Sequence, residues 1–301
     1  MRLTLAFVAI GVPGLLTLAL PDVSRGQRDP QSLLVAPTQP RTPAEERKCF
    51  HLPPGFAIEL VAAEPAIIKP IQMNFDDRGR LWVTQSIEYP FAAPKDRKPR
   101  DTIKILEDTD GDGGADKITT FASGLNIPIG VLPITHGCIA YSIPNIYRFL
   151  DTSGGDHADK QMLLYGSIGS IGFHDTHGMT GSFTLGFDGW IYATHGFAND
   201  TEMKGSDGAA IRMNSGNIYR MRPDGSHVEY YTHGQVNPFG LCIDPLGNLY
   251  SADCHTKPVM ALGVVAMIIL GSGTAATDGR NAGNEASGMR LASSMMSTSA
   301  R

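Results

Sequence analysis

The feature of this sequence that most constrains its fold is a unit of two strand-like runs joined by a glycine turn. The unit occurs four times, and its runs are rich in aromatic and β-branched residues, which is typical of β-hairpins. The turn glycines are spaced 58, 52 and 58 residues apart. The four units are Met73–Thr84, Val131–Ser142, Phe183–Thr194 and Leu241–Ser251.

A second hairpin follows each of the first three units. Two hairpins per repeat make a four-stranded blade, so the sequence predicts an all-β fold, a β-propeller. The count gives three full blades over about 70–235 and the inner hairpin of a fourth at 238–254, about three and a half blades in all. The strand-like segment Phe56–Ala62 precedes the first blade, where many propellers have a strand that pairs with their last blade and closes the ring. Since this chain has no last blade, the segment is expected to be an unpaired strand edge. The second hairpins are Ile103–Phe121, Ile146–Tyr165 and Asn217–Tyr231.

The N-terminal region predicts export. Residues 1–26 have a basic start and an apolar run from Leu3 to Leu20, as in a signal peptide cleaved near Gly26. The alternative is an uncleaved anchor that associates with the membrane. Residues 27–51 form a Pro-rich linker and a short helix, which Thr42-Pro-Ala-Glu45 predicts through its capping box. We therefore expect a periplasmic or cell-envelope protein.

The partial propeller is predicted to occupy residues 52–258, after which the character of the chain changes. Val259–Gly271 is apolar and helical or membrane-like, and the remaining residues have no period. We interpret 259–301 as a tail translated out of frame. The alternative, a membrane tail, is short for a bilayer of about 30 Å.

Charge and motifs exclude several functions. The net charge of −5 and the lack of a basic run argue against nucleic acid as a partner. No C-x-x-C-H motif occurs, so no c-type haem is attached to this chain. A glycine-rich fingerprint for nicotinamide cofactors and a serine elbow for hydrolysis are also missing from the sequence.

An aspartate-rich loop is a candidate calcium site. Carboxylates alternate along it around a glycine bend, which is the pattern of hard-cation loops. The alternative is a loop that only forms a turn. The equivalent loop one blade later, 151–159, has Ser153 and Gly155 where carboxylates stood, and we expect it to bind nothing tightly. The four candidate ligands are Asp108, Asp110, Asp112 and Asp116.

Histidines mark the predicted channel mouth. His174 and His177 precede the third inner hairpin, His195 ends it, and His255 ends the fourth. Strand ends of a propeller converge there, so these side chains could share a pocket. A histidine beside a carboxylate such as Asp175 suits general-base catalysis. Two alternatives are a transition-metal site and histidines that only bond strand-end backbone.

Several segments of residues 42–258 resemble a bacterial family called membrane-bound dehydrogenases. They are Leu52–Pro65, Glu107–Lys117, His174–Gly178, Phe187–Asn199, Met213–Asn217 and Gly234–Leu241. Members are similar to soluble glucose and sorbosone dehydrogenases, which are six-bladed propellers that use pyrroloquinoline quinone with calcium. Many also carry a C-terminal CxxCH haem domain.

The resemblance implies roles for particular residues. His177 lies at the position of a catalytic histidine ahead of an inner hairpin, and His195 stands near the end of that hairpin, close to where those enzymes have an acidic partner. His174 is a further catalytic candidate. Asn237, with His255, would contact the quinone. However, Val236 stands where those enzymes have a quinone-binding arginine, which departs from the pattern.

The expected function is therefore oxidation of a sugar or sugar alcohol, with the electron acceptor left open. As an incomplete propeller, this chain is expected to show no turnover. One alternative is a propeller that binds a carbohydrate or protein without changing it, which Val236 favours. Another is a chain that does not fold stably.

Overall fold

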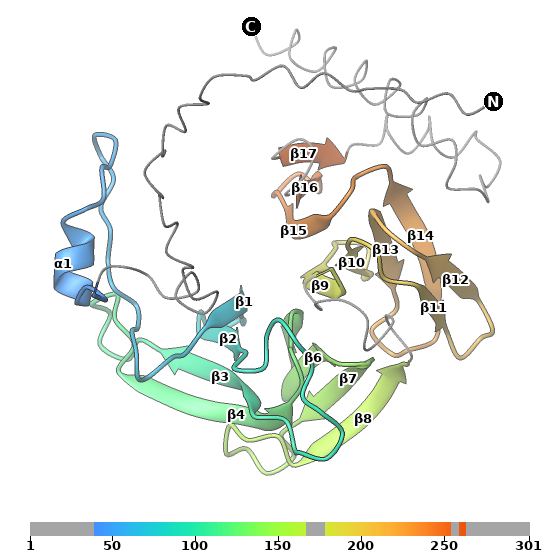
Figure 1. Ribbon diagram of the computed structural model, residues 1–301, viewed down its shortest axis with the longest axis horizontal. Helices are drawn as coiled ribbons and strands as arrows, with labels where there is room; N and C mark the ends of the chain where they lie inside the picture. The colour runs from blue at the N-terminus through green and yellow to red at the C-terminus, as the bar shows by residue number, and fades with distance from the viewer. Residues whose placement is uncertain (1–38, 167–177, 254–258, 263–301) are drawn as a thin grey trace, which may run out of the picture. The chain divides into compact units, whose positions relative to one another are not determined.

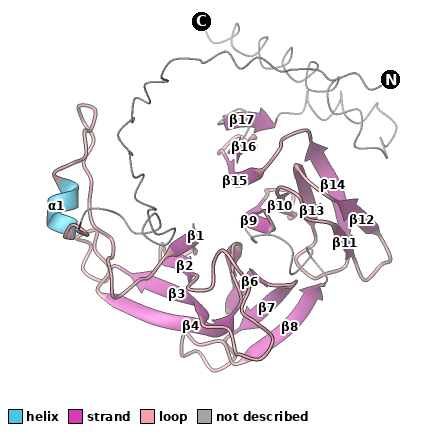
Figure 2. Cartoon of the chain, viewed as in Figure 1, coloured by secondary structure: helices cyan, strands magenta, loops and turns pink. Residues whose placement is uncertain are grey.

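The computed structural model describes residues 39–166, 178–253 and 259–262. The chain divides into two units, Met1–His51 and Leu52–Arg301, which we describe separately. In the first unit, helix α1 spans Pro43–Arg47 (Figure 2). The Thr42 side chain accepts from the Glu45 backbone N–H, and the Glu45 carboxylate accepts from the Thr42 backbone N–H. The predicted capping box is confirmed.

The second unit is built from small antiparallel sheets that form the blades of a β-propeller (Figure 1). In each of the first three blades the strands pair as two successive hairpins, as predicted. Blade 1 contains β1 (Pro70–Phe75), β2 (Leu81–Gln85), β3 (Asp101–Glu107) and β4 (Lys117–Leu125). Blade 2 contains β5 (Val131–Ile134), β6 (Gly137–Ser142), β7 (Asn145–Leu150) and β8 (Lys160–Tyr165).

Blade 3 carries an insertion, and blade 4 has three described strands. Blade 3 contains β9 (Thr180–Leu185), β10 (Ile191–His195), β13 (Asn217–Met221) and β14 (Val228–His233). A separate hairpin, β11 (Thr201–Lys204) with β12 (Ala210–Met213), lies between β10 and β13 in the chain. Blade 4 contains β15 (Pro238–Ile243), β16 (Leu249–Asp253) and β17 (Val259–Leu262).

The inner hairpins have the predicted turns. Gly79 and Gly189 adopt φ angles of +77° and +75°, a left-handed conformation in which a side chain would be strained. The innermost strands are neighbours in chain order, with β5 beside β1 and β9, and β15 beside β9. Consecutive repeats therefore form consecutive blades.

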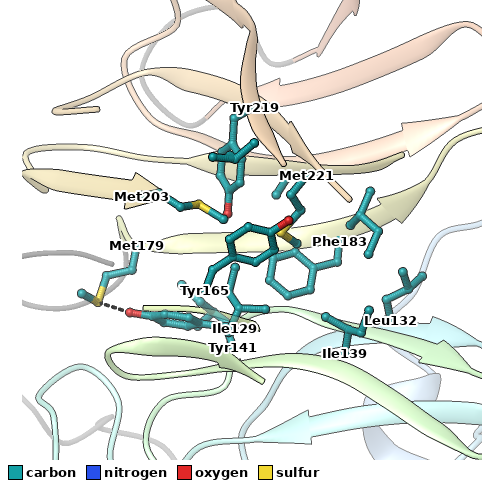
Figure 3. Packing of buried hydrophobic residues seen from close by; sticks show 14 of the residues in the cluster. Ile129, Leu132, Ile139, Tyr141, Tyr165, Met179, Phe183, Met203, Tyr219 and Met221 are labelled. Carbon is teal, nitrogen blue, oxygen red and sulfur yellow. Dashed lines mark hydrogen bonds between the residues drawn. The ribbon is translucent and has the colours of Figure 1, made fainter. Parts of the chain in front are cut away.

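The core lies between adjacent blades. Between blades 2 and 3, apolar side chains of one sheet pack on those of the next (Figure 3). Three fully buried tyrosines lie among them, and buried phenols need polar partners. The Tyr165 hydroxyl donates to the backbone oxygens of Arg222 and His227 at 2.9 and 2.8 Å, and the Tyr141 hydroxyl lies 3.0 Å from Met179 Sδ. Each blade thus depends on its neighbour for burial.

Two predictions about strands are wrong. The structure has no strand over 56–62; this segment makes one backbone bond to the aspartate loop, in which the Ala115 N–H donates to the Val61 oxygen at 2.9 Å. Within the apolar run 259–271, residues Val259–Leu262 form β17 and pair with β16 instead of starting a helix. The rest of that run lies outside the described residues. Among the described residues, no helix has the length and apolar character needed to cross a membrane.

Candidate active site

Buried polar residues gather where the second strand of each blade ends. These ends are Gln85, Ser142, His195 and Asp253, and each side chain is less than a tenth exposed. The four strands occupy equivalent places in repeated sheets, so their ends lie at the same end of the propeller. We call this region the polar end. Burial of so many polar groups requires hydrogen bonds, and these define what the site can do.

His195 is the histidine of the polar end that the structure describes. It is fully buried, and its Nε2 atom lies 2.8 Å from Thr201 Oγ1. Its Nδ1 atom is buried and has no hydrogen-bond partner among the described residues. Burial lowers the pKa of His195 to about 4, so the imidazole is neutral at neutral pH. A neutral imidazole can accept a proton.

Asn237 joins blade 4 to the loop that follows β10. Its side-chain oxygen accepts from the Phe197 backbone N–H at 2.9 Å, and its own backbone N–H donates to Asp253 Oδ2 at 3.0 Å. The side chain is 1% exposed. The structure therefore places Asn237 in a buried connection between blades.

The remaining predicted residues of the polar end cannot be placed. His174, His177 and His255 lie outside the described residues. Their predicted meeting with His195 stays a prediction.

A buried acidic pair that sequence reasoning missed orders the loop after β2. Asp101 accepts hydrogen bonds from Ser86 Oγ at 2.7 Å and from the Ile127 backbone N–H at 2.8 Å. Glu88 binds Arg97 through both carboxylate oxygens, at 2.7 and 2.5 Å, and also pairs with Arg100. The bonds from Arg97, and then those from Arg100, lower the pKa of Glu88 to about 2. This loop is thus tied to blade 1 at the polar end.

The aspartate loop brings together three of its four predicted ligands. Oxygens of Asp108, Asp110 and Asp116 lie within 4.8 Å of one another, and all three residues are exposed. Asp112 instead accepts from the Gly114 N–H at 2.7 Å. Hydrogen bonds from Thr109 lower the pKa of Asp116, so it is a carboxylate at neutral pH.

A further carboxylate, Glu59, lies against this loop. A methyl group built on Gly113 would lie 2.4 Å from Glu59 Oε2, so Glu59 rests against the glycine bend. The set of oxygen donors fits a hard divalent cation such as calcium. No sequence signal identified Glu59, because it comes from a segment well before the loop.

The equivalent loop of blade 2 is different. Asp151 accepts backbone bonds from Gly154 at 2.7 Å and Asp156 at 2.8 Å, and Asp159 accepts from Thr152. The loop's own N–H groups donate to these carboxylates, as they also do in the aspartate loop, where Asp108 accepts from the N–H groups of Gly111 and Gly113. The aspartate loop differs in that it brings three carboxylates together.

Comparisons with known proteins match this chain to one family, and to solved structures of low sequence identity. The family model described as a domain of unknown function, DUF7133, matches residues 42–288. No curated protein matches the sequence.

The similar solved structures include three propeller proteins. The pyranose dehydrogenase PQQ domain of Coprinopsis cinerea is 15% identical, with 65% of this chain and 51% of that chain covered and a TM-score of 0.43. The PQQ-bound aldose sugar dehydrogenase of Streptomyces coelicolor is 20% identical, with 62% and 57% covered and a TM-score of 0.39. The gluconolactonase XC5397 of Xanthomonas campestris is 13% identical, with 65% and 58% covered and a TM-score of 0.42. The aligned part of this chain spans 51% to 58% of the length of these three.

Proposed function

The chain belongs to the DUF7133 family, and because that family is described only as a domain of unknown function, we infer its role from its own residues. We propose that it is an exported sugar-binding propeller of the sugar dehydrogenase class, an oxidoreductase that acts on an aldose or sugar alcohol. The apolar run Leu3–Leu20 supports export to the periplasm or cell envelope.

The observation that carries the proposal is the chemistry of the polar end. It combines a neutral, buried His195 with uncharged hydrogen-bonding groups such as Ser142 and with buried acidic groups such as Asp253. Hydroxyl groups of a polyol both donate and accept, so they can pair with acceptors and donors of this kind.

The proposed oxidation requires two chemical roles. Oxidation of a sugar hydroxyl group removes a proton from oxygen and a hydride from carbon. We assign proton removal to His177, as the resemblance implies, and His174 is the second candidate for that role. His195 is a neutral residue at the end of β10 that is held by its contact with Thr201 Oγ1, and we assign it a positioning role.

A hydride acceptor is also needed, and pyrroloquinoline quinone would supply that chemistry when bound. The described residues around Asn237 do not fit this anionic group. Val236 stands in place of the expected arginine, and the side-chain oxygen of Asn237 already accepts from Phe197. We therefore derive no step through the quinone, and the electron acceptor stays open.

Calcium fits the chain better than the quinone does. Asp108, Asp110 and Asp116 would hold the ion through carboxylate oxygens, with Asp112 fixing the bend of the loop. An ion held there would order the loop between β3 and β4 and would take no part in proton transfer.

A second function is favoured by one observation. Val236 stands where the resemblance implies an arginine that contacts the quinone, and binding of a neutral saccharide does not need that cation. A propeller that binds a carbohydrate without oxidising it therefore follows if no electron acceptor binds.

One experiment separates these functions. The full chain is incubated with calcium, pyrroloquinoline quinone and a panel of aldoses and sugar alcohols, and reduction of an electron-accepting dye is followed. Equilibrium dialysis with radiolabelled D-glucose is run in parallel. Sugar-dependent dye reduction supports the oxidoreductase, and binding without reduction supports the second function. Neither binding nor reduction by the folded chain contradicts both.

A further inference from the structure

A small hollow opens between blades 3 and 4 at the end of the strands opposite to the polar end. It has a volume of about 190 Å³. Its rim is formed by the β9–β10 turn, through Gly186 and Phe187, and by Gly247 of the β15–β16 turn. Tyr192 of β10 and Tyr231 of β14 form its wall. The hollow is therefore separate from the histidines and from the aspartate loop.

Three aromatic side chains line this hollow, together with the aliphatic side chains of Ile243 and Leu249. The rings of Tyr192 and Tyr231 meet edge to face, with centroids 4.8 Å apart and planes at 83°. Phe187 lies on the rim with 75% of its surface exposed. An exposed phenylalanine at the mouth of a pocket offers a flat ring face to a ligand. The electron-rich faces of such rings attract the C–H groups of an aliphatic ring.

One carboxylate gives the hollow a polar side. Asp188 Oδ2 accepts from the Tyr192 hydroxyl at 2.8 Å and lies 3.2 Å from an Arg220 nitrogen. The side chain of Asp188 is still 43% exposed. A carboxylate has about four acceptor positions, so Asp188 keeps capacity for ligand hydroxyl groups.

The surrounding charges decide which ligand fits. The Arg220 guanidinium lies 5.9 Å from the centre of the Tyr231 ring and also binds Glu229 at 2.6 Å. A cationic ligand over these aromatic rings would meet a cation already in place. An anionic ligand would face Asp188 and Glu229. The hollow therefore favours a neutral ligand with an apolar face and several hydroxyl groups.

We propose that this hollow is a binding subsite for one pyranose ring of a neutral saccharide, stacked on Phe187 and hydrogen-bonded to Asp188. A volume of about 190 Å³ is below the usual range for drug-sized ligands, which agrees with a single ring. The subsite lies away from the polar end, so it would hold a saccharide chain or a second sugar without taking part in oxidation. It does not depend on the proposed function.

The test uses cellobiose and isothermal titration calorimetry on the full chain. Phe187→Ala removes the stacking face from an exposed position, and Asp188→Asn weakens the acceptor. Leu246→Ala is the matched control, because Leu246 is 87% exposed in the adjacent turn and does not line the hollow. We expect cellobiose to bind, with its Kd raised at least fivefold by Phe187→Ala and unchanged by Leu246→Ala. Thermal melting verifies that each variant is folded.

Two results would overturn the inference. One is a folded wild-type chain that binds no cellobiose at millimolar concentration, or that binds choline more tightly. The other is cellobiose binding that Phe187→Ala leaves intact. That second result assigns the saccharide to another site, and it leaves the proposed function of the polar end standing.

Discussion

His195 Nε2 lies 2.8 Å from the hydroxyl oxygen of Thr201, the first residue of β11. His195 is the last residue of β10, so the inserted β11–β12 hairpin supplies the partner of the buried imidazole. This contact links a strand of blade 3 to a hairpin that the repeat pattern does not contain. It also keeps the imidazole away from bulk water, which is the cause of its low basicity.

The buried imidazole makes the fold sensitive to mild acid. The pKa of His195 is about 4 in the folded chain because burial disfavours the charged form, and its ordinary value is 6.5. The unfolded chain therefore binds a proton below pH 6.5 that the folded chain does not bind until about pH 4. Stability contributed by the neutral ring is complete above pH 6.5 and is lost between pH 6.5 and 4, by up to roughly 3 kcal/mol.

His195→Gln tests this dependence. We expect the slope of unfolding free energy against pH, measured by urea denaturation from pH 7 to 4, to be shallower in the variant. His51→Gln replaces an exposed histidine and should keep the wild-type slope. Identical slopes for wild type and His195→Gln would contradict the account of a buried neutral histidine.

We predict that the ion pairs of Glu88, which hold the loop after β2, contribute less stability at lower pH. Bonds from Arg97 and Arg100 depress the pKa of Glu88 to about 2 from its ordinary value of 4.5. The stability that this carboxylate contributes is present above pH 4.5 and is lost as pH falls toward 2.

Glu88→Gln should lower the unfolding free energy at pH 7 by about 1–3 kcal/mol, because it leaves arginine donors poorly paired beside a buried group. Glu202→Gln is the control, since its pair with Arg212 is exposed and such pairs contribute little. Equal effects of the two substitutions in chemical denaturation would show that Glu88 does not anchor the loop.

Calcium should stabilise the chain through the aspartate loop. At a calcium concentration of 100 times Kd, one site adds about 2.7 kcal/mol to the unfolding free energy. We expect Asp110→Asn to remove this increment. Asp151→Asn changes the equivalent loop of blade 2, so it should lower stability without altering the calcium increment. A melting temperature that calcium does not change in the wild-type chain would rule out the site.

Local patterns predicted most of the fold. The inner hairpins β1–β2 and β9–β10 follow from glycine turns between runs rich in aromatic and β-branched residues, a pattern that depends on nearby residues only. The β11–β12 hairpin was missed because Thr201–Lys204 is short and has one apolar residue, Met203. The strand β17 was missed because a continuous apolar run looks the same in a helix and in a buried strand.

The candidate site was predictable where its residues are close in sequence. The spacing of Asp108, Asp110 and Asp116 predicted a shared site for their carboxylates, and the structure places oxygens of all three close to one another. Glu59 and Thr201 could not be identified, because their contacts depend on how distant segments pack. Sequence reasoning suggested Asn237 as a ligand of the quinone, whereas only the structure shows its bond to the Phe197 backbone.

The measurement that tests the central claim most directly is the rate of sugar-dependent dye reduction by the full chain and its His177→Asn variant. A general base typically contributes a factor of 10² to 10⁴. The incomplete ring by itself predicts no turnover, whereas the proposed function predicts that an aldose is oxidised with the dye as electron acceptor. In that case we expect kcat to be at least 100-fold lower and KM little changed in His177→Asn, while Phe187→Ala keeps the wild-type kcat. A wild-type rate that His177→Asn leaves unchanged, or no turnover with any aldose or sugar alcohol, would contradict the account.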